Sequence, residues 1–139
     1  MSVDTRQLNV SDDRVAVILV DHGSIIDESN QLLVEIVDAY RGHSDWAIVE
    51  PAHMELAEPS IAAAFGRCAE QGAELVIVMP YFLGPGRHSS QDIPRLTAAA
   101  ARAFAGVEYM VTAPLGLHEL MLQVIDERIG EAIGASAKR

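Results

Sequence analysis

Short apolar runs alternate with stretches of helical periodicity along this chain. The runs cover residues 15–20, 46–49, 75–79 and 109–111. The first and third are uninterrupted apolar segments, a pattern typical of strands buried on both faces of a parallel sheet. Each run ends in residues that favour turns or loops, so we predict four strands.

Between these runs, apolar residues recur every three to four positions, which predicts helices. The first helix ends at Arg41-Gly42, and its apolar face is formed by Leu32, Leu33, Ile36, Val37 and Tyr40. The second helix has Pro59 in its first turn, where proline is well tolerated, and ends at Gly72.

Two further helices follow the third and fourth runs. One opens at Ser89 and Asp92, which have capping-box spacing, and ends at Gly106. The last helix carries one apolar stripe, formed by Leu117, Leu120, Met121, Val124, Ile125, Ala132 and Ile133.

Strand and helix thus alternate four times, which predicts an α/β fold. The same pattern predicts a parallel sheet with right-handed crossovers and with helices on both of its faces. We expect one domain at residues 14–134, a flexible lead-in at 1–13 and a flexible tail at 135–139. Four strands are few for such a sheet, so a homodimer is a natural expectation.

The composition restricts the class of protein. The formal net charge is −10, which argues against nucleic-acid binding, since such proteins usually carry a basic patch. No apolar stretch approaches the roughly 20 residues that span a bilayer, and the N-terminus lacks targeting features. The single cysteine, Cys68, excludes an internal disulfide or cysteine-ligated cluster, and we expect it to fill the core of a helix. These features favour a cytoplasmic protein.

Titratable side chains follow the predicted strands and would meet at the carboxyl edge of the sheet, where ligands of open parallel sheets bind. They are His22, His53, Glu55, His88 and His118. Imidazole and carboxylate together suit a divalent metal or a proton abstraction. The alternative for each histidine is a solvated loop position. For His53 a further alternative is packing against the sheet, and for His118 capping of the last helix. His43 falls at the opposite edge.

The loop after the third strand has an unusual apolar content. Tyr81, Phe82 and Leu83 suit one wall of a flat apolar ligand site, although they are equally suited to cap the core beneath the loop. The loop matches neither a dinucleotide-binding nor a phosphate-binding motif. Ser24, directly after His22-Gly23, is better interpreted as a cap or turn residue than as a nucleophile.

Four segments resemble a known family: DHGS at 21–24, EPAHMELAEPSI at 50–61, PYFLGPGRHSSQDIP at 80–94 and TAPLGLHELM at 112–121. They are similar, in order and spacing, to the small class II chelatases of the CbiX/SirB type, which insert a divalent metal into sirohydrochlorin. The resemblance implies a flavodoxin-like, three-layer α/β/α half-lobe with a four-stranded parallel sheet, which dimerises with its cleft between the lobes.

The resemblance also implies roles for individual residues. The metal-handling histidines fall on His22 and His88 and the active-site carboxylate on Glu55, which makes these three the expected catalytic and metal-binding residues. The expected substrate-binding residues are Ser24, Tyr81, Phe82, Leu83, Gly86, Arg87 and Ser89. The metal is a substrate, with Fe²⁺ expected first. No prosthetic cofactor is expected, and no iron–sulfur cluster, because the plant-type cysteines are absent.

The chain departs from the family pattern at two places. Ile25-Ile26-Asp27 stands where the family usually has a basic residue, and Ser89-Ser90 follows His88 where many plant-type relatives carry an aromatic residue. Alternatives to a ferrochelatase are therefore a cobalt or nickel chelatase of the same family, or a non-catalytic relative that binds tetrapyrrole or metal. A plain flavodoxin-like interaction domain leaves the convergence of histidines and Glu55 unexplained.

Overall fold

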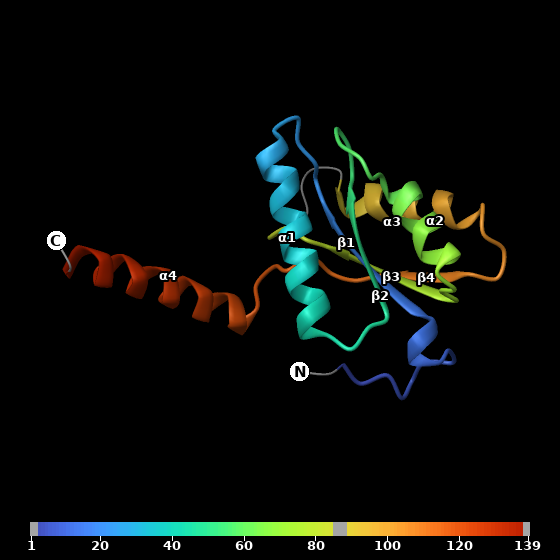
Figure 1. Ribbon diagram of the computed structural model, residues 1–139, viewed down its shortest axis with the longest axis horizontal. Coiled ribbons are helices and arrows are strands. Elements are labelled where there is room, and N and C mark those ends of the chain that lie inside the picture. Colours follow the sequence, from blue (N-terminus) through green and yellow to red (C-terminus); the bar gives the residue numbers. More distant parts are fainter. Residues whose placement is uncertain (1–2, 85–88, 138–139) are drawn as a thin grey trace.

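Four parallel strands form the sheet around which the chain folds (Figure 1). The computed structural model describes residues 3–84 and 89–137. The sheet has the order β2-β1-β3-β4. Its strands are β1 (Val15–Asp21), β2 (Ile48–His53), β3 (Leu75–Pro80) and β4 (Glu108–Val111). The two uninterrupted apolar runs form the central strands β1 and β3. The expected burial on both faces is confirmed for β1, whereas β3 is fully buried on one face only.

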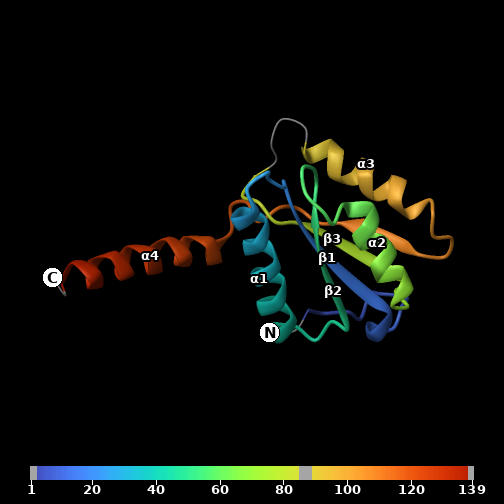
Figure 2. The same ribbon diagram turned by 45° about the horizontal axis from the view of Figure 1, so that its top comes forward.

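A helix follows each strand, and a short 3₁₀ helix (Asp12–Arg14) precedes β1. The helices are α1 (Asp27–His43), α2 (Ile61–Glu70), α3 (Ser89–Ala101) and α4 (Glu119–Ala137). Figures 1 and 2 show α1 on one face of the sheet and α2 with α3 on the other. The predicted α/β architecture with helices on both faces is therefore confirmed.

The core consists of two clusters, one on each face of the sheet. On one face, Phe65 and Cys68 of α2 pack with Ile18 and Val78 of the central strands. On the other face, Leu33 and Val37 of α1 pack with the alternate positions of β1 and β2. Cys68 is fully buried, as the sequence predicted. Its burial, with a smaller effect from the charge of Glu50, raises the pKa of the thiol to about 12.

Helix α4 does not cover the sheet of its own chain. Figures 1 and 2 both show it projecting away from the rest of the molecule, and none of its side chains is buried. Its predicted apolar stripe is therefore largely exposed. No helix in residues 3–84 and 89–137 is long and apolar enough to cross a membrane.

Strand β2 is longer than the sequence predicted. It begins at Ile48 and continues to His53, whereas we expected a strand at 46–49 followed by a loop. Pro51 lies within it, paired with Leu19 of β1. Proline is tolerated there because β2 is an edge strand, so its missing N–H faces away from the sheet. His53 is consequently the last residue of a strand and not a loop residue.

Several helix ends also differ from the prediction. Helix α2 begins at Ile61, not at Pro59, because Ser60 is its N-cap and its Oγ accepts a hydrogen bond from the Ala63 N–H at 3.1 Å. Helix α1 continues past Gly42 to His43. Helix α3 begins at Ser89, as expected, but ends at Ala101. The last two strands start or end one residue outside the predicted runs.

Candidate functional site

The carboxyl ends of β1 and β2 bring His22 and Glu55 together. The Glu55 N–H donates to the His22 carbonyl at 3.1 Å, and the Met54 N–H donates to the Asp21 carbonyl at 2.8 Å. These bonds extend the pairing of β1 with β2 beyond the last strand residues. Both side chains are exposed. Two of the three residues expected to handle the metal are thus neighbours, held by backbone hydrogen bonds.

Gly23 makes this approach possible. Its φ is +85°, a backbone conformation that side chains disfavour, and a Cβ at this position would lie 1.8 Å from the carbonyl oxygen of Glu55. No residue with a side chain fits between the two strand ends without moving them apart. The glycine of the DHGS segment is therefore required by the close contact between the two loops.

Phe82 fixes the orientation of the His22 ring. The two rings are stacked, with centroids 4.3 Å apart and planes inclined by 25°. Phe82 itself is half-buried and packs against the core on the α2 side. Tyr81, by contrast, packs against the core on the α1 side, and its N–H donates to the Val20 carbonyl at 2.6 Å. Leu83 is 66% exposed.

This loop therefore combines both of the roles that the sequence left open. Tyr81 and Phe82 cover the core, and Phe82 also presents its ring to His22. Leu83 leaves an apolar side chain in solvent at the same edge of the sheet. An aromatic ring on a histidine and an exposed leucine beside it suit a flat apolar ligand.

The buried side chain of His53 pairs with the partly buried carboxylate of Asp21 at the ends of β2 and β1. The His53 Nδ1 lies 2.6 Å from the Asp21 Oδ1, and the two residues are register partners at the ends of β2 and β1. His53 is 1% exposed. The interpretation of His53 as a residue packed against the sheet is thus confirmed. The carboxylate of Asp21 provides a buried ring nitrogen with the hydrogen-bond partner that it needs.

Ser24 organises the turn that leads from the site into α1. Its Oγ accepts a hydrogen bond from the Ile26 N–H at 2.9 Å. The side chain of Asn30 bonds to the backbone of Ser24 twice, at 3.0 Å through its oxygen and at 2.7 Å through its nitrogen. Ser24 is therefore a turn residue, as predicted. Asn30 was not identified from the sequence, because a polar residue in a first helical turn has no distinctive pattern.

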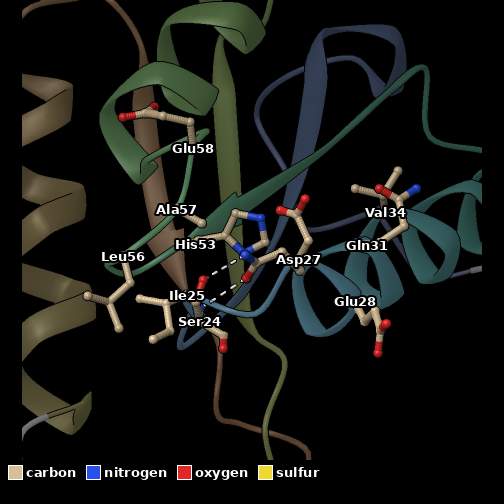
Figure 3. A pocket seen from close by; sticks show the side chains of 11 residues that line it. Ser24, Ile25, Asp27, Glu28, Gln31, Val34, His53, Leu56, Ala57 and Glu58 are labelled. Carbon is tan, nitrogen blue, oxygen red and sulfur yellow. Dashed lines mark hydrogen bonds between the residues drawn. The ribbon is translucent and has the colours of Figure 1, made fainter.

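A pocket of about 560 Å³ lies next to this turn, between the start of α1 and the segment after β2 (Figure 3). Its lining includes three carboxylates, from Asp27, Glu28 and Glu58, together with His53, and no lysine or arginine side chain. Ile25 also lines it and is 86% exposed. The pocket therefore repels anionic groups at close range.

The remaining expected site residues fall on the loop before α3. His88, Gly86 and Arg87 lie outside the residues that the structure describes, and Ser89 is the first residue of α3. Within residues 3–84 and 89–137, no three histidine, cysteine, aspartate or glutamate side chains converge as a metal site. The described part of the chain thus contributes His22 and Glu55 of the predicted trio.

Two other histidines have local roles. His118 precedes α4, and its Nδ1 accepts a hydrogen bond from the Leu120 N–H at 3.1 Å. The interpretation of His118 as a helix cap is thus confirmed. His43 is the last residue of α1 and therefore lies at the opposite edge of the sheet from His22.

The chain matches the sequence model of the CbiX family over residues 16–132. It is 55% identical over 117 residues to the chloroplastic sirohydrochlorin ferrochelatase of Arabidopsis thaliana, a match that covers 84% of this chain and 52% of the relative. It is also 31% identical over 140 residues to the sirohydrochlorin cobaltochelatase of Methanopyrus kandleri, which covers 86% of this chain and 98% of that protein.

The fold is similar to that of a solved structure of SirB from Bacillus subtilis with Fe³⁺. The TM-score is 0.79 and the identity 26%, and the match covers 86% of this chain and 47% of SirB. The chain thus spans about half the length of the plant relative and of SirB, but nearly the whole length of the Methanopyrus protein.

Proposed function

Because this chain belongs to the CbiX family, we propose that it is a chelatase that inserts a divalent metal, Fe²⁺ first, into sirohydrochlorin. The observation that carries the proposal is the juxtaposition of His22 and Glu55 at the carboxyl edge, with Phe82 stacked on the histidine. The 55% identity to a plant sirohydrochlorin ferrochelatase supports both the substrate and the metal.

The reaction exchanges protons for a metal. A free-base tetrapyrrole carries two inner N–H groups, and both protons leave as the divalent ion binds the four nitrogens. The imidazole of His22 is suited either to accept one of these protons or to hold the incoming ion. Stacking on Phe82 limits rotation of the ring, so the side chain is oriented before substrate binds. Glu55 holds the hydrated ion or relays the proton to solvent.

The proposed site also takes residues from the loop after β3. His88 acts with His22 on the metal, and Tyr81, Phe82, Leu83 and Gly86 form the wall against the macrocycle. Arg87 and the start of α3 at Ser89 bind the carboxylates of the substrate, since backbone N–H groups at a helix start favour anions. Ser24 contributes through the turn beside His22. The acidic pocket at Asp27 and Glu58 is unsuited to these carboxylates.

The active unit in this proposal is a homodimer. Two copies place their carboxyl edges face to face, and sirohydrochlorin binds in the cleft between them. SirB supports this arrangement, because this chain matches only 47% of it while sharing its fold. The metal ion is a substrate in this scheme and the protein needs no prosthetic group. A cytoplasmic location stays a prediction, because the name of the plant relative assigns that protein to the chloroplast.

One observation favours a second candidate function. Ile25 is 86% exposed beside a pocket lined by carboxylates, where the family usually has a basic residue. Loss of a cation there weakens attraction for an anionic substrate. The alternative is therefore a relative that binds tetrapyrrole or metal without catalysing insertion. Turnover separates the two functions, since a binding protein does not accelerate metallation.

The test is an anaerobic metallation assay with sirohydrochlorin and Fe²⁺, Co²⁺ or Ni²⁺, followed by the absorbance of the macrocycle against a blank without protein. We expect acceleration with Fe²⁺, and a loss of about 10²-fold or more in His22→Ala and Glu55→Gln. The matched controls are His43→Ala, at the opposite edge, and Glu70→Gln, at the end of α2.

Binding of sirohydrochlorin without acceleration by any metal would replace the proposal with the binding function. A higher metallation rate with Co²⁺ than with Fe²⁺ would indicate a cobaltochelatase. The rates have to be compared because histidine and carboxylate ligands alone do not select among these metals.

A further inference from the structure

Helix α4 presents an apolar face that nothing in its own chain covers. Leu117, just before the helix, is 94% exposed, and Ile125, Ile129 and Ile133 are each more than half exposed. These residues recur at helical spacing, so they form one stripe along the helix. A surface helix of this kind normally buries such a stripe against a sheet or another helix.

The sheet has a matching apolar strip that the helices of its own chain cover only in part. On the α2–α3 face, the β3 residues Val76 and Val78 are fully buried, whereas on the α1 face Ile77 and Met79 are only partly buried. Met110 of β4, the register partner of Ile77, is 43% exposed. Helix α1 packs over β1 and β2 on this face. Ile77 and Met79 reach the edge of the α1 cluster, so the strip formed by Ile77, Met79 and Met110 is covered only in part and has room for a second helix beside α1.

The connection between β4 and α4 leads the helix away from that strip. The Thr112 N–H donates to the Val78 carbonyl at 2.9 Å, and the Leu115 N–H donates to the Phe82 carbonyl at 3.0 Å. The connection is thus bonded to the carboxyl edge, beside the ring that stacks on His22. Figures 1 and 2 show that α4 then continues outward from this edge instead of turning back along the sheet.

We propose that two copies of this chain exchange their α4 helices, each helix covering the Ile77–Met79–Met110 strip of the other copy. The inference rests on the proposed dimer, in which the carboxyl edges face each other, and specifies what holds that dimer together. Because α4 leaves from the carboxyl edge, it enters the space that the facing copy occupies.

The dimensions suit a stable dimer. A helix of 19 residues is about 28 Å long and about 10 Å wide, so one face covers about 300 Å². Two exchanged helices and the two strips beneath them together bury about 1,200 Å², which reaches the range of specific interfaces. An apolar groove between Leu83 and α4, lined by Leu117, Met121 and Ile125, continues the stripe to the edge that carries His22. The partner is thereby connected directly to the site.

Cysteine cross-linking tests the exchange. The native Cys68 is fully buried and its raised pKa keeps it a thiol, so introduced cysteines react alone with a short bismaleimide. The test variant carries Met110→Cys and Ile125→Cys in one chain. Exchange predicts covalent dimers on a denaturing gel. The control combines Met110→Cys with Gln123→Cys, which lies on the opposite side of α4, and we expect at least a tenfold lower yield of dimer from it.

Two results would overturn the exchange. A cross-linked monomer would show that α4 folds back on its own sheet, and an absence of cross-linking in a folded protein would show that the helix does not reach the strip. Mixing Met110→Cys chains with Ile125→Cys chains gives a second measurement, because only exchange joins the two. Metallation is measured separately: a monomer that metallates sirohydrochlorin refutes the exchange alone, and an exchanged dimer without activity refutes the chelatase alone.

Discussion

Gly23 is the residue on which the arrangement of the site depends most directly. Its φ of +85° and the 1.8 Å approach to the Glu55 carbonyl leave no room for a side chain. We predict that Gly23→Ala displaces Glu55 from His22 and reduces metallation about as strongly as removal of His22 itself. The measurement is the metallation rate with Fe²⁺ at saturating sirohydrochlorin.

Gly72 provides the matched control, because its φ is also positive, at +97°, but nothing lies within 4 Å of an added Cβ. Gly72→Ala therefore carries the backbone cost of about 1–2 kcal/mol without disturbing the site, and we expect its activity to be unchanged. Equal activity losses in the two variants would mean that strain alone, and not the contact with Glu55, explains the effect.

The pair of Asp21 and His53 joins the ends of β1 and β2, one residue before His22. Removing His53 leaves a cavity and an aspartate whose side chain is only 22% exposed without its partner. We predict that His53→Ala lowers the free energy of unfolding by about 2–4 kcal/mol, measured by urea denaturation. His43→Ala, an exposed histidine at the other edge, changes it little.

A double-mutant cycle isolates the contribution of the pair. Because the two side chains are 2.6 Å apart, Asp21→Ala and His53→Ala should couple by about 0.5–3 kcal/mol. Additive losses in the double variant would indicate that His53 stabilises the strand ends by packing alone.

At the scale of single elements, the sequence predicted the central strands well and the edge less well. The apolar runs of β1 and β3 predict burial on both faces, which the structure confirms for β1, whereas Ile77 and Met79 on one face of β3 are only partly buried. The predicted strand ended at residue 49, four residues before the end of β2, because Glu50-Pro51 is typical of the end of a strand. Only the sheet order, which places β2 at an edge, explains why proline is accommodated there.

The start of α2 gives the same lesson for helices. Pro59 fits a first helical turn, but Ser60 provides the side-chain oxygen that accepts a hydrogen bond from a free N–H group of that turn. Ser60 is therefore the N-cap, and the helix starts at Ile61. We predict that Ser60→Ala lowers the free energy of unfolding by about 1 kcal/mol, measured by thermal denaturation. Ser29→Ala, at an exposed position in α1, is the control. Equal effects of the two variants would show that the cap contributes nothing beyond helix propensity.

For the whole molecule, the order of strands and helices was sufficient to predict that His22 and Glu55 meet at one edge. The position of α4 was not predictable in the same way. An apolar stripe at helical spacing indicates that a helix is covered, but it does not indicate whether the cover belongs to the same chain. Whether α4 covers its own sheet depends on the seven residues between β4 and α4. Their hydrogen bonds to Val78 and Phe82 lead the helix outward.

Exchange of α4 makes folding and association one process, which gives a prediction for the intact protein. When the folded state is a dimer and the unfolded state a monomer, mass action stabilises the folded state as the protein concentration rises. A tenfold increase in protein concentration stabilises the folded dimer by about 1.4 kcal/mol, so we expect the Tm to rise by about 2–5 °C.

In Ile125→Glu, a charge on the stripe opposes burial of α4, and the Tm should become lower and independent of concentration. Gln123→Glu adds the same charge on the opposite side of the helix and should keep the concentration dependence. A Tm independent of concentration in the unaltered protein would mean that the chain completes its core alone.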